Sequence, residues 1–197
     1  MRAEAQLNCK PATDRERRTM NGKGILIAVA AVLALAVVSG VAISAQDKYA
    51  LKLPDGIEFS DFKGYGDWQL ISSSKTDDRL KVILGNPVII AAFKSGIPGN
   101  GKPFPNGSKI AKLQWKPKKS TEATFPVDVP DTLADLFFME KDSNRFPATG
   151  GWGYAQFDYD PASATFSADK AGTPACGNVC HLAVKARDYT FHPYQTR

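Results

Sequence analysis

Near its carboxyl end the chain carries two cysteines followed directly by a histidine, in the segment Cys176-Gly177-Asn178-Val179-Cys180-His181. Three residues separate the cysteines, so the segment reads C-x-x-x-C-H, one residue longer than the C-x-x-C-H attachment pattern of a c-type haem, which it resembles. In such a site the thiols of Cys176 and Cys180 add across the vinyl groups of one haem, and His181 binds the iron as the proximal axial ligand. The motif therefore predicts one covalent haem c per chain and a fold that buries a cofactor.

Two other interpretations of the cysteine pair are weaker. A redox pair is expected after the strand of a thioredoxin-like unit, and nothing before Cys176 suggests such a unit. A zinc site needs two more ligands at suitable spacing. The only other cysteine is Cys9, which precedes a predicted export segment, and the only other histidine is His192. Covalent haem is therefore the preferred interpretation.

The amino-terminal part of the chain has the pattern of an export signal. A basic stretch ending at Lys23 precedes residues 24–45, an uncharged and mostly apolar run that ends in small residues. Cleavage after Ala42 or Ala45 and retention as an anchor both stay open, since the run is long enough to span a bilayer. We expect a periplasmic protein, bound to the membrane only if this segment is retained.

The net charge of +5 does not describe the exported part. Residues 1–45 hold six basic and three acidic side chains, so the remainder carries a net charge of +2. A nearly neutral domain gives no reason to expect nucleic-acid binding. We expect residues 46–66 to be a polar lead-in and residues 67–197 to form one haem domain, large enough to bury a core.

The pattern of apolar and turn-forming residues predicts an α+β fold. Strands are predicted over 79–84, 108–115 and 152–157. A helix is expected over 87–94 with a stop at Gly96, and another around the haem motif within 168–185. Periodicity does not decide between strand and short helix for 131–141. Turns are expected over 72–78 and 116–119. The sum is a mainly antiparallel sheet with a few helices, the last of which carries the haem motif.

Several blocks of the exported part, taken in order, resemble the cytochrome P-460 family. The blocks are Lys81 to Asn86, Pro105 to Ser108 running into Ala111 to Leu113, Lys141 to Ser143, Gly150 to Tyr154, Cys176 to His181 and Asp188 to Phe191. The resemblance covers about residues 67–194. It rests on the order of the blocks together with the paired cysteines and histidine of the segment from Cys176 to His181.

The resemblance implies a small periplasmic haem protein, usually a homodimer, with a mainly antiparallel β fold and an iron that is open on its distal side. The cytochromes P-460 after which the family is named oxidise hydroxylamine and carry a lysine bonded covalently to the haem ring. The sister branch, cytochrome c′-β, lacks this bond and binds gases such as nitric oxide.

The family lysine matches Lys112, which follows the Asn106-Gly107 turn by a few residues. Strand alternation places Lys112 on one face with Ile110 and Gln114, so that it can point into a buried pocket. The alternative is a surface lysine, since several other lysines lie nearby. A basic residue of the distal pocket matches Lys81, although an exposed strand lysine is equally compatible with the pattern.

The chain departs from the hydroxylamine-oxidising pattern at Phe137. The resemblance implies a distal carboxylate shortly before Lys141, and the matching position holds Phe137, while Asp135 and Glu140 lie out of register. A phenylalanine cannot accept the protons that hydroxylamine oxidation releases. It would form an apolar wall that favours small uncharged ligands.

Three functions remain open on the sequence. The first is a hydroxylamine-oxidising haem oxidoreductase that passes electrons to a soluble acceptor. The second is a binding protein for nitric oxide or another gas. The third is simple electron transfer with a sixth iron ligand from His192 or Met139. His192 lies too close to His181 in sequence to cross easily to the opposite haem face, and Met139 is better explained as a core residue.

Overall fold

The computed structural model describes residues 46–195, except for residue 55 and residues 170–173. The strands are β1 (Gln69–Lys75), β2 (Leu80–Gly85), β3 (Lys109–Lys119), β4 (Asp128–Lys141), β5 (Trp152–Asp160) and β6 (Thr165–Ala168). The α-helices are α1 (Pro87–Lys94) and α2 (Pro174–Leu182). The short 3-10 helices are η1 (Lys48–Ala50), η2 (Phe59–Phe62), η3 (Tyr65–Asp67), η4 (Pro147–Thr149) and η5 (Lys185–Arg187).

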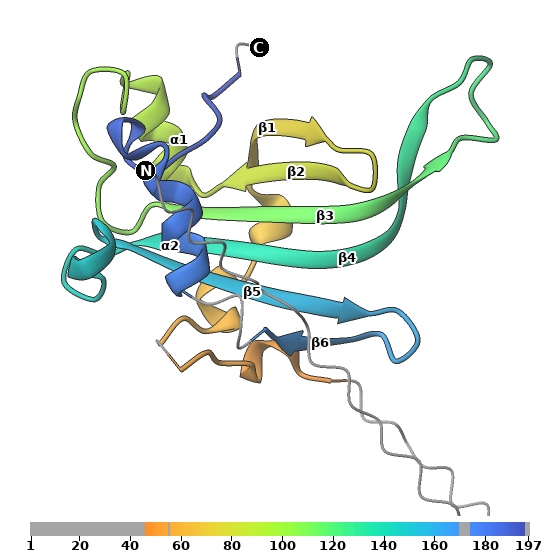
Figure 1. Cartoon of the computed structure of the whole chain (residues 1–197), viewed down its shortest axis with the longest axis horizontal. Helices are drawn as coiled ribbons and strands as arrows, with labels where there is room; N and C mark the ends of the chain where they lie inside the picture. Colours follow the sequence, from red (N-terminus) through yellow and green to blue (C-terminus); the bar gives the residue numbers. More distant parts are fainter. Residues whose placement is uncertain (1–45, 55, 170–173, 196–197) are drawn as a thin grey trace, which may run out of the picture. The chain divides into compact units, whose positions relative to one another are not determined.

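The six strands form one antiparallel sheet in sequence order, β1-β2-β3-β4-β5-β6 (Figure 1). Each strand therefore pairs with its neighbours in the chain, and α1 is an excursion between β2 and β3. The pairing aligns Ile83, Lys112, Phe137 and Gln156 in one row across β2 to β5. The predicted α+β fold with a mainly antiparallel sheet is confirmed.

One face of the sheet carries an aromatic core. Phe59 and Phe62 of η2 are fully buried against Phe138 of β4, with ring centroids 5.2 Å and 4.1 Å from it. Leu53 and Ile57 join the same cluster. The segment 46–66, expected as a polar lead-in, thus contributes four large apolar side chains to the core. Burial of such side chains is the main favourable term in folding.

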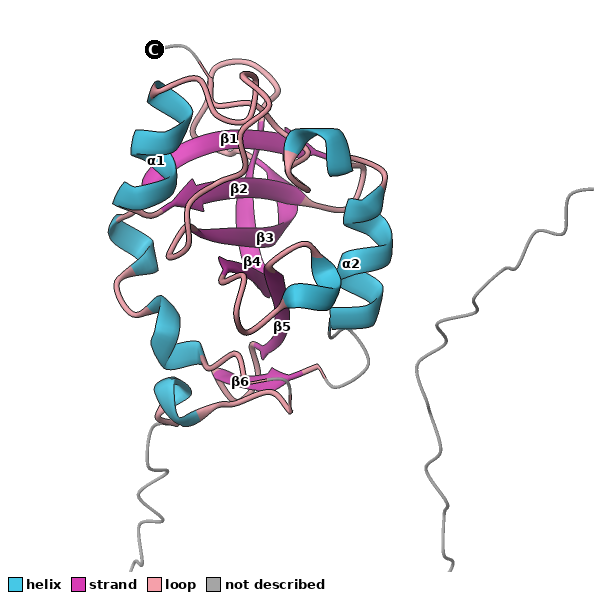
Figure 2. Ribbon diagram, turned by 90° about the vertical axis from the view of Figure 1, so that its left-hand side faces the viewer, coloured by secondary structure: helices cyan, strands magenta, loops and turns pink. Residues whose placement is uncertain are grey.

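The other face of the sheet is covered by α2 and the segment that follows it (Figure 2). Helix α2 packs on β5 at Gly177, where an added Cβ would lie 2.7 Å from Cγ of Tyr154. This close approach is possible because glycine has no side chain. The predicted C-terminal helix is therefore present and includes the segment 176–181, and it lies directly over the sheet.

Helix α1 begins and ends where the sequence indicated. The Asn86 side chain caps its start by accepting a hydrogen bond from the Ile89 amide, and Pro87 occupies the first turn. Gly96, two residues past the last helical residue, has a φ of +90° and so takes the left-handed conformation that ends many helices.

Three local predictions differ from the structure or are settled by it, and one strand was not predicted. Residues 72–78 were predicted as a turn, yet most of them belong to β1. Residues 116–119 were also predicted as a turn, and they extend β3 into a long hairpin arm with β4. The ambiguous segment 131–141 is strand. Strand β6 had no prediction. In each case pairing with a neighbouring strand decides the conformation.

The predicted export segment, residues 24–45, lies outside the described residues. Within the part of the chain that is described, no helix is long and apolar enough to cross a membrane.

Candidate functional site

A cavity of about 430 Å³ lies between the sheet and the segment from α2 to His192. Its size falls within the range of small-molecule and cofactor sites. Residues of β1 to β5 form one side of it, and residues of α2 and of the segment up to His192 form another. The lining residues are Ile71, Ser74, Lys81, Ile83, Phe93, Ile110, Lys112, Phe137, Phe138, Met139, Tyr154, Ala155, Gln156, Gly177, Cys180, His181, Thr190, Phe191 and His192.

His181, near the end of α2, is held in one orientation. Its Nδ1 lies 2.6 Å from the backbone carbonyl oxygen of Tyr189. Since a carbonyl can only accept, Nδ1 carries the proton and Nε2 keeps a free lone pair. The ring is half-buried and packs between Tyr154 and Phe191, with centroids 5.1 Å and 4.8 Å away. This is the arrangement of a metal-binding histidine, whose second nitrogen usually donates to a fixed acceptor.

Electrostatics favour the neutral form of His181. Burial lowers its pKa, and the charge of Lys112 acts in the same direction, while the hydrogen bond to Tyr189 partly opposes both. A histidine must be neutral to offer a lone pair to a metal. The cavity therefore keeps His181 ready to bind a metal ion at neutral pH.

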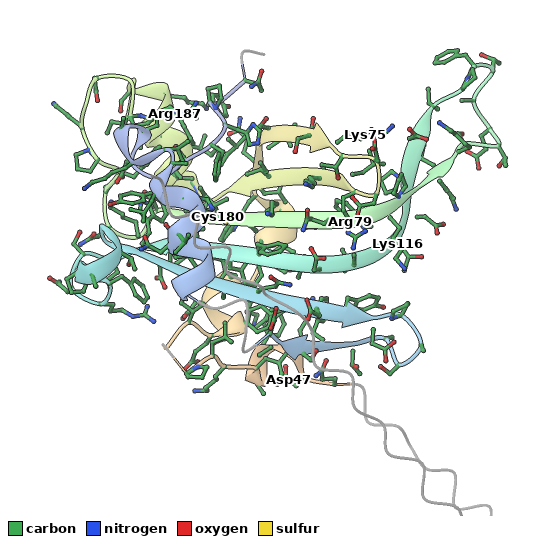
Figure 3. All side chains as sticks on the ribbon, viewed as in Figure 1. Asp47, Lys75, Arg79, Lys116, Cys180 and Arg187 are labelled. Carbon is green, nitrogen blue, oxygen red and sulfur yellow. The ribbon has the colours of Figure 1, made fainter. Side chains whose placement is uncertain are left out.

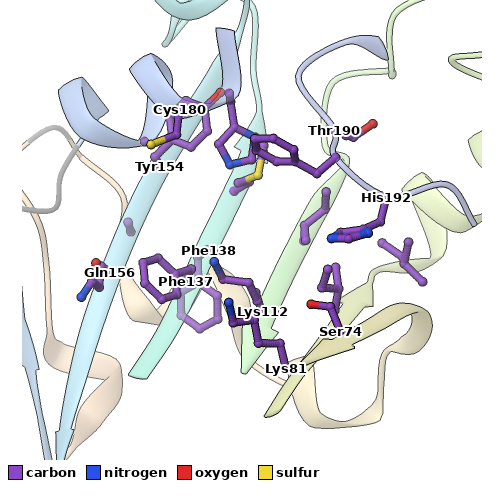
Figure 4. Close-up of a pocket in the computed structure, with 18 of the residues that line it drawn as sticks. Ser74, Lys81, Lys112, Phe137, Phe138, Tyr154, Gln156, Cys180, Thr190 and His192 are labelled. Atoms are coloured by element: carbon purple, nitrogen blue, oxygen red, sulfur yellow. The ribbon is translucent and has the colours of Figure 1, made fainter. Parts of the chain in front are cut away.

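Lys112 lies in the middle of the sheet and points into the cavity (Figure 4). Its Nζ is 3.9 Å from the centroid of the Phe137 ring, which is a cation–π contact. Burial lowers the pKa of Lys112, and the nearby Lys81 lowers it further. Among the described residues neither lysine forms an ion pair. A lysine desolvated in this way is a reactive amine.

The structure brings five of the six predicted site residues to this cavity: Lys81, Lys112, Phe137, Cys180 and His181. The sixth, Cys176, belongs to α2, and its side chain lies outside the described part. Figure 3 shows Cys180 on α2, over the sheet, and its thiol is free and exposed.

The two residues considered as sixth ligands, Met139 and His192, also line the cavity. No aspartate or glutamate does so within the described residues. Asp135 instead accepts a hydrogen bond from Gln114, and Glu140 forms an ion pair with Lys109. Both carboxylates are therefore engaged elsewhere, in agreement with their positions out of register.

Sequence reasoning missed several residues of the cavity. Tyr154 stands against Gly177 and beside His181, and the carbonyl of Tyr189 orients His181. Ile71 lies on β1, one residue before the segment 72–78 that the sequence predicts as a turn. Tyr154 lies within the strand expected over 152–157, but no pattern in the sequence identifies the face that α2 covers.

The cavity fits a haem. Its walls are mainly apolar, as a large flat macrocycle requires, and Cys180 and His181 stand together at one side of it. Tyr154 has a buried hydroxyl without a hydrogen-bond partner, and burial raises its pKa, so the neighbourhood of α2 holds a polar group still available to a ligand. The zinc interpretation gains no support, since no three His, Cys, Asp or Glu residues cluster in the described part.

Comparison with known proteins agrees with this geometry. A family model described as Cytochrome P460 matches residues 62–192, which include every strand of the sheet and the segment from Cys176 to His181. No curated protein matches the chain.

Proposed function

Since the chain belongs to the cytochrome P460 family, which implies a haem cofactor, we propose that it is a periplasmic c-type haem protein that oxidises hydroxylamine. The observation that carries the proposal is the orientation of His181 in the cavity. Its Nδ1 is bound to the Tyr189 carbonyl, and Lys112 points into the same space.

Three residues would hold the cofactor. Cys176 and Cys180 would form the thioether bonds, and Nε2 of His181 would bind the iron. When bound, a haem supplies an iron that takes up a small ligand and passes its electrons to an acceptor. Lys112 points into the same cavity, and we assign to it the family's covalent bond to the ring.

The remaining walls select the ligand. Phe137 and its apolar neighbours form an apolar wall beside a space that suits small uncharged molecules. The positive charge of Lys81 disfavours a cation, so that neutral hydroxylamine is preferred over hydroxylammonium. Selection of an uncharged nitrogen species follows from these two effects together.

A second candidate function is binding of nitric oxide without turnover. It is favoured by Phe137, which takes the place of a proton-accepting carboxylate, and by the lack of any carboxylate among the described residues that line the cavity. Hydroxylamine oxidation sheds protons and needs an acceptor for them. Gas binding has no such requirement.

Three further features belong to the proposal. The apolar run 24–45 would direct the chain to the periplasm, as a soluble protein or as one held by its anchor. A soluble electron acceptor would receive the electrons. Family resemblance favours a homodimer.

The test is steady-state oxidation of hydroxylamine by matured protein with an artificial electron acceptor, beside titration of reduced protein with nitric oxide. We expect sustained turnover that is lost in Lys112→Met and kept in Lys116→Met, an exposed lysine on the same strand. Tight nitric oxide binding without turnover would select the second function. A six-coordinate, low-spin spectrum in both oxidation states would refute both functions and indicate electron transfer.

A further inference from the structure

A buried ion pair joins β4 to the segment that follows α2. Lys141 Nζ donates to Asp188 Oδ1 at 2.7 Å and to Oδ2 at 3.0 Å, and it also donates to the Gly150 carbonyl at 2.8 Å. The side chains of Lys141 and Asp188 are 4% and 11% exposed. Asp188 Oδ2 accepts a further hydrogen bond from the Phe104 amide at 2.7 Å. The carboxylate is therefore fixed from two directions.

The backbone at this point has an unusual conformation. Asp188 and Tyr189 have φ values of +43° and +64°, a left-handed region that residues with side chains rarely occupy. Such a conformation persists only where the surroundings hold it in place. The Lys141–Asp188 ion pair and the burial of Tyr189 provide that support.

The same turn presents the acceptor for His181. Tyr189 follows Asp188 directly, and its carbonyl oxygen lies 2.6 Å from His181 Nδ1. A shift of the turn would move this oxygen away from the imidazole, because only one peptide unit separates it from the anchored residue. The ion pair and the histidine are thus coupled through the backbone.

We propose that Lys141 and Asp188 are positioning residues for His181: they lock the turn at 188–189 so that the Tyr189 carbonyl holds the imidazole with its Nε2 toward the cavity. This inference rests on the proposed binding of haem iron by His181. Neither Lys141 nor Asp188 lines the cavity, and the positioning effect that we propose reaches His181 through Tyr189.

The expected consequence is electronic as well as structural. A hydrogen bond from the second ring nitrogen makes a metal-bound histidine more basic. A more basic axial ligand stabilises ferric over ferrous iron, and hydrogen bonding around the axial ligand is one of the ways in which a protein sets the haem potential. Loosening the turn should therefore weaken the iron–histidine bond and raise the midpoint potential.

The experiment compares matured, full-length Asp188→Ala with Asp188→Asn. Alanine removes the anchor, whereas asparagine keeps one acceptor oxygen, which in the place of Oδ2 can still accept from Lys141 and from the Phe104 amide. The control is Lys109→Gln, which breaks a partly buried ion pair with Glu140 that does not line the cavity. The readouts are the iron–histidine stretching band of the reduced protein, by resonance Raman spectroscopy, and the midpoint potential.

For Asp188→Ala we expect the band to move to lower frequency and broaden, with a raised midpoint potential. Asp188→Asn and Lys109→Gln should keep the wild-type band. Equal shifts in Asp188→Ala and Asp188→Asn would mean that the lost charge acts directly on the iron, which overturns the proposal. An unshifted band in Asp188→Ala would also overturn it, by showing that the ion pair is merely structural.

If Asp188→Ala does not fold, because Lys141 is left buried without a partner, the double variant Lys141→Met/Asp188→Leu takes its place. It removes both charges and should give the same shift as expected for the single variant, while an unshifted band would overturn the proposal. A wild-type protein without any iron–histidine band would instead refute the proposed function. The two failures are therefore distinguishable.

Discussion

Replacement of Gly177 by alanine tests the packing of α2 on the sheet. A Cβ at this position would lie 2.7 Å from Cγ, 2.8 Å from Cβ and 2.9 Å from Cδ1 of Tyr154. These atoms stand at the root of the tyrosine side chain and cannot swing aside. Helix α2 would have to move away from β5, and His181 would move with it.

The magnitude follows from two opposing effects. Alanine in place of glycine inside a helix stabilises by about 1 kcal/mol. Overpacking of a tight contact destabilises by about 1–3 kcal/mol. Because the contact involves atoms next to the backbone, we expect the upper part of that range and a net loss of about 1–2 kcal/mol. A loss of 1 kcal/mol lowers the unfolding midpoint of a domain of this size by roughly 3 °C.

The matched control is Gly66→Ala in η3, where an added Cβ would meet nothing within 4 Å and the backbone is not left-handed. This change should raise the free energy of unfolding by about 0.4–1 kcal/mol, because alanine leaves the unfolded chain fewer conformations than glycine does. The assay is urea unfolding of both matured variants, followed by far-ultraviolet circular dichroism. Opposite signs are expected for the two changes. Equal stabilisation by both would refute the close contact between α2 and β5.

Three further predictions concern the cavity and the core. Phe137→Glu places a carboxylate beside Lys112, and it should raise the rate of hydroxylamine oxidation in a steady-state assay; an unchanged rate would show that no proton acceptor is missing. Burial raises the pKa of Asp135 above its ordinary value of 3.8. The charged carboxylate therefore destabilises the fold once the pH rises above that value. Asp135→Asn should therefore raise the unfolding midpoint at pH 7 and leave it unchanged at pH 3, and the reverse pattern would contradict this assignment. Phe138→Ala should destabilise by about 3–5 kcal/mol in urea unfolding, whereas Phe125→Ala, at a site 66% exposed, should change little; similar losses in both would refute the placement of the core.

The sheet was predictable where local patterns and strand pairing agree. The apolar alternation in β3 and β5 identified both strands and the face that Lys112 occupies. Strand β1 was missed because three successive serines have little preference for a strand. Its conformation follows from pairing with β2, including an irregularity in register between Leu70 and Ser72. Such pairing depends on the partner and is invisible in the segment alone.

The site was predictable as a set of residues and unpredictable as a geometry. The motif identified Cys180 and His181 directly, and the family resemblance identified Lys112. The carbonyl of Tyr189 could not be foreseen, because a backbone oxygen leaves no trace in the sequence. The contact between Lys141 and Asp188 spans 47 residues and depends on how the carboxyl-terminal segment folds back over the sheet.

The most direct test of the account is the intact mass of protein matured alongside a periplasmic haem-attachment system, measured with and without a thiol-alkylating reagent. We predict a coloured protein whose mass equals the exported chain plus one haem, with Cys176 and Cys180 both resistant to alkylation. A Lys112 bond to the ring would lower this mass by a pair of hydrogen atoms. Colourless protein in which both thiols are alkylated would contradict the central claim that this cavity holds a covalent haem.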